Sequence, residues 1–338
     1  MKVLLLFLAA GIFLAAGAAA QTWTPHSSGT TASLRGVSAV SAKVIWASGA
    51  NGTYLESTDG GVTWRTATVP GAEQLDFRAV YGVDQRTAYL VSIGEGDKSR
   101  VYKTVDGGLH WTLQYKNSDP KGFFDAVAFW NARQGIVLGD PVDGQFAVLI
   151  TNDAGEHWTR RRTPAALPNE GAFAASNSCL TVMGDGEVWF ATGGTAAARV
   201  FHSRDAGQTW TVATTPIRND GASAGIFSLA FADARHGVAV GGDYAKPADA
   251  ARNIAITSDG GRTWTEPSGQ RPGGFRSAVA YLAGRGVWIA TGTSGSDVST
   301  DNGSSWEPFD SGAYNAISFA AGGSGWAVGP EGRLAEFR

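Results

Sequence analysis

Apolar and polar residues alternate in short runs along residues 21–338, and glycine-rich turns separate the runs. Residues 77–81, 87–93 and 100–104 show this pattern with many β-branched or aromatic side chains, and a fourth run follows around Trp111. Alternation with a period of two is typical of half-buried strands. Because no segment after residue 20 has a convincing helical period, the pattern predicts an all-β protein.

A short motif recurs six times along the chain, each time after the third predicted strand of a group. Each copy has an aspartate, a glycine-containing turn and a tryptophan five residues after the aspartate. The six aspartates are Asp59, Asp106, Asp153, Asp205, Asp259 and Asp301. Their separations of 42 to 54 residues fit one four-stranded propeller blade per repeat. The aspartate can accept hydrogen bonds from turn amides, and glycine supplies the positive φ, so the motif predicts a structural turn.

The repeat phase predicts seven blades. The first strands of the blades begin near Leu34, Phe77, Phe124, Cys179, Ile226, Phe275 and Tyr314. Six tryptophans mark the fourth strands, and Trp23 supplies the seventh mark one repeat ahead of the first. We therefore expect residues 21–25 to complete a last blade whose other three strands come from the C-terminus. Such a closure protects the edges of the ring, and it makes residues 21–338 a single domain.

The six motifs resemble the Asp box, also called the bacterial neuraminidase repeat. Their order along the chain resembles that of the photosystem II stability and assembly factor family and its exported bacterial relatives, over essentially all of residues 21–338. The loops at 139–144, 170–177, 223–228 and 241–244 are similar to those of the bacterial group. Members are often loosely labelled oxidoreductases or repeat-containing glycosidases. The resemblance implies a seven-bladed propeller with a non-catalytic scaffold role.

Residues 1–20 predict a signal peptide, with Lys2 followed by an apolar run and small residues before a cut at Gln21. The alternative is an uncleaved membrane anchor. The expected mature chain is periplasmic or secreted, monomeric and without a membrane span. It carries 26 basic and 30 acidic residues, a balance that argues against nucleic-acid binding. The single cysteine, Cys179, can form no internal disulfide, and we interpret it as a buried apolar residue.

Connectivity separates two rims of the ring. The six aspartate turns join the third and fourth strands, so the loops before the first strand and between the second and third strands lie at the opposite rim. Those loops carry functional side chains and form the expected mouth of a binding site. The candidates in these loops are Asp140, Glu170, Asn177, Asp243 and Tyr244.

A second candidate set lies just after the start of the first strands. Arg35, Arg78, Asp125 and Arg276 share one repeat phase, so we expect them at similar height around the channel. Three arginines beside one aspartate favour a pocket for a carboxylate or another anion. The alternative is a channel plug in which Asp125 pairs with Arg78 or Arg276.

Two functions follow from these residues. The first is a non-catalytic module that holds a protein partner or a small anionic ligand at the mouth. The second is a glycosidase, because three arginines resemble the sialidase triad and Tyr244 or Tyr314 could join acidic residues in catalysis. The sequence favours the first, since sialidases have six blades and an Arg-Ile-Pro signature that Arg35 lacks.

No cofactor and no metal are expected. The chain lacks a glycine fingerprint for a nicotinamide or flavin, a Cys-x-x-Cys pair and a histidine-rich metal signature. An oxidoreductase activity is therefore less favoured than a glycosidase.

Overall fold

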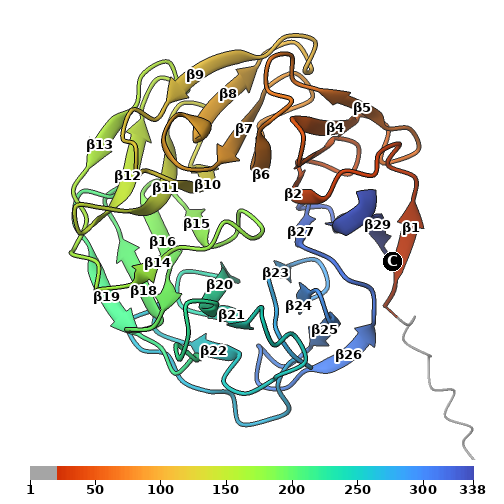
Figure 1. Cartoon of the computed structure of the whole chain (residues 1–338). Coiled ribbons are helices and arrows are strands. Elements are labelled where there is room, and N and C mark those ends of the chain that lie inside the picture. The colour runs from red at the N-terminus through yellow and green to blue at the C-terminus, as the bar shows by residue number, and fades with distance from the viewer. Residues whose placement is uncertain (1–20) are drawn as a thin grey trace, which may run out of the picture.

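The computed structural model describes residues 21–338, so the predicted signal peptide lies outside the described residues. Seven antiparallel sheets surround a central channel in this part of the chain (Figure 1). This arrangement confirms the seven-bladed, all-β prediction. The only helices described are two single 3-10 turns, η1 (Gly96–Lys98) and η2 (Pro330–Gly332). No helix among these residues is long and apolar enough to cross a membrane.

The strands of each blade run from the channel outward. The first blade contains β2 (Leu34–Ala39), β3 (Ile45–Gly49), β4 (Thr53–Ser57) and β5 (Arg65–Thr68). The second contains β6 (Asp76–Gly82), β7 (Ala88–Ile93), β8 (Arg100–Thr104) and β9 (Thr112–Lys116). The third contains β10 (Phe124–Phe129), β11 (Gly135–Val142), β12 (Gln145–Thr151) and β13 (Thr159–Arg161). The fourth contains β15 (Leu180–Met183), β16 (Glu187–Ala191), β18 (Arg199–Ser203) and β19 (Thr211–Thr214).

The fifth blade contains the short strands β14 (Glu170–Gly171) and β17 (Gly193–Gly194), then β20 (Ala224–Phe231), β21 (Gly237–Asp243) and β22 (Ile254–Thr257). The sixth contains β23 (Ala278–Leu282), β24 (Val287–Gly292), β25 (Gly295–Ser299) and β26 (Glu307–Asp310). The seventh contains β27 (Ala316–Phe319), β28 (Gly325–Val328), β29 (Leu334–Phe337) and β1 (Trp23–His26).

The last blade closes the ring as the repeat phase predicts. Strand β1 pairs antiparallel with β29, and Trp23 lies opposite Phe337. The two ends of the described chain therefore meet in one sheet, beside each other in Figure 1.

The fifth blade differs from the prediction of a fourth strand near Trp264. Only an isolated bridge between Ile256 and Thr265 stands where the outer strand was expected. Pro267 follows two residues later, and a proline has no amide hydrogen to continue the ladder. This blade gains β14 and β17 at its inner edge instead, so an additional segment reaches the channel there.

The six repeat turns, each running from the Ser or Thr before the aspartate to the tryptophan after it, share one hydrogen-bond pattern. In the first, Ser57 donates to Asp59, the Gly61 amide donates to Ser57, and the Thr63 amide and hydroxyl donate to Asp59. The bonds from Thr63 lower the pKa of Asp59 to about 2. Gly61 has a φ of +83°, and a Cβ there would collide with Trp326 of the seventh blade. Each repeat turn therefore fixes both its own backbone and the packing between blades.

We expect Asp259→Ala to lower the free energy of unfolding by about 1–2 kcal/mol, because the Arg262 and Thr263 amides lose their acceptor at a partly exposed turn. Urea unfolding of the variant measures this loss. Asp233→Ala is the comparison, because that aspartate also caps exposed turn amides but lies outside the repeat turns. Full stability of Asp259→Ala would show that the motif has no structural role.

Candidate functional site

Backbone irregularities turn several side chains into the channel. The register between the first and second strands breaks at Arg35, Arg78, Asp125 and Phe227, so each of these residues is an extra residue in its strand. Asp140 occupies a similar break between β11 and β12. A β-bulge bends its strand and redirects the side chain of the extra residue. Repeated bulges at one height thus direct charged and aromatic groups toward the mouth.

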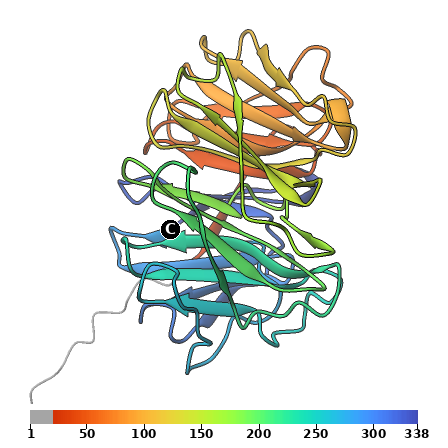
Figure 2. The ribbon, with the colours of Figure 1, turned by 90° about the vertical axis from the view of Figure 1, so that its left-hand side faces the viewer.

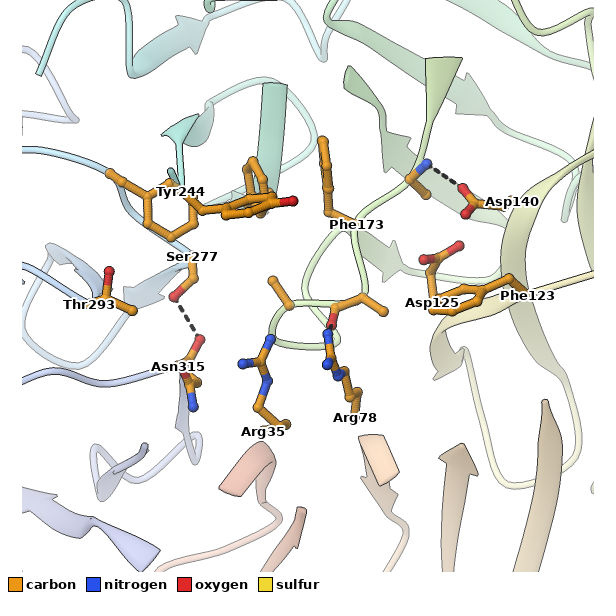
Figure 3. A pocket seen from close by; sticks show the side chains of 15 residues that line it. Arg35, Arg78, Phe123, Asp125, Asp140, Phe173, Tyr244, Ser277, Thr293 and Asn315 are labelled. Carbon is orange, nitrogen blue, oxygen red and sulfur yellow. Dashed lines mark hydrogen bonds between the residues drawn. The ribbon is translucent and has the colours of Figure 1, made fainter. Parts of the chain in front are cut away.

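These side chains line a pocket of about 520 Å³ at the rim opposite the repeat turns (Figure 3). Six of the seven blades and the segment between β14 and β15 contribute its walls. The pocket is lined by Arg35, Arg78, Phe123, Asp125, Asp140, Ala172, Phe173, Ala174, Ala175, Phe227, Tyr244, Phe275, Ser277, Thr293 and Asn315. We call it the mouth pocket.

Two arginines form one side of the mouth pocket and point into it in Figure 3. Arg78 donates through Nε to Asp76 at 2.8 Å and through Nη1 to the Ala174 carbonyl at 3.2 Å. The side chain of Arg35 makes no hydrogen bond to any described residue, and its Nε is buried. Burial, and then the charge of Arg78, lower the pKa of Arg35 to about 10. Arg35 therefore stays charged at neutral pH and presents free donors to the pocket.

Two carboxyl groups form another side, next to Phe123 in Figure 3. Asp125 is 1% exposed, and its oxygens accept no hydrogen bond of ordinary geometry within residues 21–338, although the Ala174 amide is near enough to lower its pKa. Burial and the neighbouring Asp140 raise the pKa of Asp125 well above its usual range. Asp140 accepts a bond from the Ala172 amide at 2.9 Å, but burial raises its pKa to about 6.

The third wall is aromatic. Phe173 stacks on Phe227 with 3.9 Å between ring centroids, and Phe275 meets Phe227 edge-on at 4.7 Å. Tyr244 contacts both Phe227 and Phe275 edge-on and is 55% exposed. An exposed tyrosine over a buried aromatic cluster provides a rigid apolar surface for a ligand.

The floor of the pocket is the segment 172–178 between β14 and β15, which Figure 1 shows crossing the centre of the ring. Ser176 donates to the Ser277 carbonyl at 2.7 Å, and Ser178 is bonded to Ser228. Asn177 accepts from the Val127 amide and donates to the Val80 carbonyl. The segment is thus tied to four other blades, and it closes the channel below the mouth pocket.

Comparison with known proteins identifies the family. The family model of the DUF6242 beta propeller domain matches residues 9–230. The chain belongs to this family. The resemblance to the photosystem II assembly factor family is confirmed as well. The photosystem II assembly protein Ycf48 of Synechococcus sp. (strain JA-2-3B'a(2-13)) is 25% identical over 150 residues, which are 44% of this chain and 40% of that protein.

Solved structures share the fold of this DUF6242 propeller. A structure of YCF48 bound to D1 peptide has a TM-score of 0.66 and 17% identity, covering 93% of this chain and 96% of the other. YCF48 from Cyanidioschyzon merolae gives a TM-score of 0.66 and 18% identity, with 95% and 99% covered. The WD40 beta-propeller domain of Doa1 gives 0.64 and 12%, with 94% and 97% covered.

The structure brings together five of the nine candidates in the mouth pocket of the DUF6242 propeller. The five are Arg35, Arg78, Asp125, Asp140 and Tyr244. The predicted plug pairing of Asp125 with Arg78 or Arg276 is wrong, because Arg78 pairs with Asp76 and Arg276 pairs with Asp297. A plug does exist, but segment 172–178 forms it.

The predicted convergence of Arg276 with the other two arginines is also wrong. Arg276 is 2% exposed, and its guanidinium bonds to Asp297 at 2.5 Å, the Phe275 carbonyl and Ser294. Asp297, on β25 of the same blade, is 1% exposed and forms the ion pair with this guanidinium. The side chain of Arg276 therefore stays within its blade.

Three further candidates have their polar groups engaged in the fold and do not line the mouth pocket. Glu170 pairs with Arg199 and accepts a bond from Thr192. Asn177 adopts a positive φ of 67° and bridges two strands, as described above. Asp243 accepts a bond from the Ala245 amide and is buried. These contacts explain the side chains without a ligand.

Sequence reasoning missed the aromatic wall as a unit. Phe227 shares the phase of Arg35 and Arg78, and that phase could have indicated its place in the channel. Phe173 and Phe275 have no such signal, because Phe173 belongs to the plug segment and Phe275 precedes its strand. No cluster of three or more metal-binding side chains occurs among the described residues. Cys179 is buried, in agreement with its interpretation as an apolar residue.

The two carboxyl groups predict an unusual dependence of stability on pH. Asp140 has a pKa of about 6 in the folded protein against 3.8 as the ordinary value, so folding favours its protonated form. The free-energy cost of ionising Asp140 in the folded protein is absent below pH 3.8 and complete above about pH 6. Relative to Asp140→Asn, we expect the protein to lose up to about 3 kcal/mol of stability between pH 4 and pH 7.

Chemical unfolding of both proteins across this range measures the difference and cancels the titrating groups that do not interact with Asp140. Asparagine keeps an oxygen for the Ala172 amide, so the fold is preserved in the comparison. A difference that does not change with pH would show that Asp140 is solvated as an ordinary carboxylate.

Proposed function

We propose that this chain is a non-catalytic scaffold that binds a segment of a protein partner in the mouth pocket. The observation that carries the proposal is the combination of free Arg35 donors with an exposed tyrosine over an aromatic cluster. Arginine binds carboxylates through paired hydrogen bonds, and the aromatic wall can pack against apolar side chains. An acidic or carboxylate-bearing peptide segment fits both features.

The relatives support a scaffold role. Ycf48 is an assembly protein, and YCF48 has been solved bound to D1 peptide. We propose the same kind of activity for this chain, the holding of a partner segment during assembly. We also propose that the chain acts outside the cytoplasm, as residues 1–20 indicate.

The glycosidase alternative gains no support from these relatives. Glycosidases place two carboxyl groups on either side of the scissile bond. Asp125 and Asp140 lie on the same side of the mouth pocket in Figure 3. A small anionic ligand would use the same arginines and is distinguished by the experiment below.

We expect a photo-crosslinking phenylalanine at Tyr244 to capture one protein partner in cells, because this side chain is exposed over the pocket. The same group at Leu109, on the exposed repeat-turn rim, should not capture that partner. Arg35→Met should reduce capture at position 244 about tenfold or more, since a charge-assisted hydrogen bond is lost. Mass spectrometry of the crosslinks quantifies both.

Arg35 makes no bond within the described residues, so Arg35→Met should keep the melting temperature. Arg160→Met, on the exposed outer strand β13, is the matched control and should leave capture unchanged. Equal capture by the unaltered protein, Arg35→Met and Arg160→Met would exclude Arg35 from the site. Crosslinks to no protein would contradict the scaffold role and leave a small ligand.

A further inference from the structure

The buried carboxyl group of Asp125 lacks a counter-charge. No arginine, lysine or histidine nitrogen among the described residues lies within 4 Å of its oxygens. Arg78 is the cation whose charge lowers the pKa of Asp125, but its guanidinium bonds to Asp76 and Ala174 instead. A buried charge without a partner is costly, so such groups are rarely kept in a fold for packing alone.

Asp125 faces the mouth pocket together with Asp140 (Figure 3). The two come from bulges on adjacent strands, β10 and β11, which pair antiparallel. Asp140 uses Oδ1 for the Ala172 amide, so the second oxygen of this carboxyl group has no bond from the described residues. We call these two residues the carboxyl pole of the pocket.

Other groups around the carboxyl pole do not neutralise it. Arg35 on β2 and Arg78 on β6 face it from the arginine side, where Arg78 is paired with Asp76. Lys121 lines an adjacent hollow with Asp140 but is exposed and forms no ion pair with it. Burial raises the pKa of the Cys179 thiol, which is therefore neutral. Phe173 of the plug segment stands between the carboxyl pole and Tyr244 in Figure 3. An organic cation placed there would meet carboxylates and the face of an aromatic ring, the two groups that attract it most strongly.

We propose that the carboxyl pole binds an ammonium or guanidinium group of the partner segment, so that the mouth pocket recognises a segment carrying both signs of charge. This inference rests on the proposed function and specifies the chemistry of the partner. A basic side chain satisfies Asp125 and Asp140, while an acidic group of the same segment contacts Arg35. Without a bound segment, burial keeps Asp125 largely protonated, and the arriving cation displaces its proton, whereas Asp140 is already ionised at pH 7.5.

The test uses a pooled library of acetylated hexapeptides with randomised sequence, passed over the immobilised protein at pH 7.5. Acetylation of the N-terminus alone removes the terminal amine, so the side chains of lysine and arginine are the strong cations available. Mass spectrometry should show basic residues enriched about tenfold over the input in the retained peptides. Asp125→Asn and Asp140→Asn should lose that enrichment and still retain acidic peptides. Asp143→Asn, exposed on the same rim, should behave as the unaltered protein.

Lowering the pH to 5 should also reduce the retention of basic peptides, because protons compete at Asp140, and this dependence should vanish in Asp140→Asn. Retained peptides without basic enrichment, or enrichment that survives in both variants, would overturn the inference and leave the scaffold role standing. Retention of no peptide would overturn both. Melting temperatures at or above that of the unaltered protein would show that the two variants are folded, since asparagine replaces a buried ionisable group with a neutral one of the same shape.

Discussion

Replacing Trp23 by alanine is expected to lower the free energy of unfolding by about 3–5 kcal/mol, the usual cost of truncating a buried tryptophan. Trp23 is 4% exposed and contacts Tyr314 and Phe337, with ring centroids 5.5 and 5.2 Å apart. Its indole donates to Ser296 of the sixth blade at 3.0 Å. One side chain thus joins the closing strand to both of the last two blades.

The loss of stability should exceed the loss of local packing energy alone, because β1 is the only strand that covers the outer edge of β29 within the described residues. Loss of this strand would expose unpaired backbone groups at a sheet edge. Urea unfolding measures the change, and Thr24→Ala on the same strand is the control, since Thr24 is only half-buried. Deletion of residues 21–25 should destabilise the protein further. An unchanged urea midpoint in both Trp23→Ala and the deletion variant would contradict closure through β1.

Arg276→Met is expected to cost a similar amount, about 3–5 kcal/mol, because it leaves Asp297 buried without its counter-charge. The loss comes from the missing counter-charge and not from a cavity, since methionine fills much of the same volume as arginine. A second change, Asp297→Asn, should recover part of the loss by removing the remaining charge. Thermal or urea unfolding of the single and double variants forms a cycle that measures the coupling of the two residues.

The same variants separate a structural arginine from a binding one. Arg276 does not line the mouth pocket, so capture of the partner at position 244 should be unchanged wherever Arg276→Met remains folded. Arg35→Met should show the reverse, with reduced capture and an unchanged melting temperature. Weaker capture with full stability in Arg276→Met would place this residue back in the site.

The sequence by itself determined the architecture. Six repeat turns with regular spacing define the blades, because each turn is local: its aspartate, glycine and tryptophan lie within a few residues. The seventh blade follows from the phase of Trp23, and the pairing of β1 with β29 confirms it. Repeats make such predictions reliable, since every blade packs against neighbours of the same design.

Only the tertiary structure decided which in-phase side chains form the site. Arg35 and Arg276 share a repeat phase, yet Arg35 reaches the pocket and Arg276 is captured by Asp297. A bulge and a buried partner on another strand make the difference, and neither can be inferred from spacing alone. The aromatic wall also joins Phe173, Phe227 and Phe275 across about a hundred residues of sequence. Their contact depends on the plug segment entering the channel, which is a property of the closed ring and not of any single repeat.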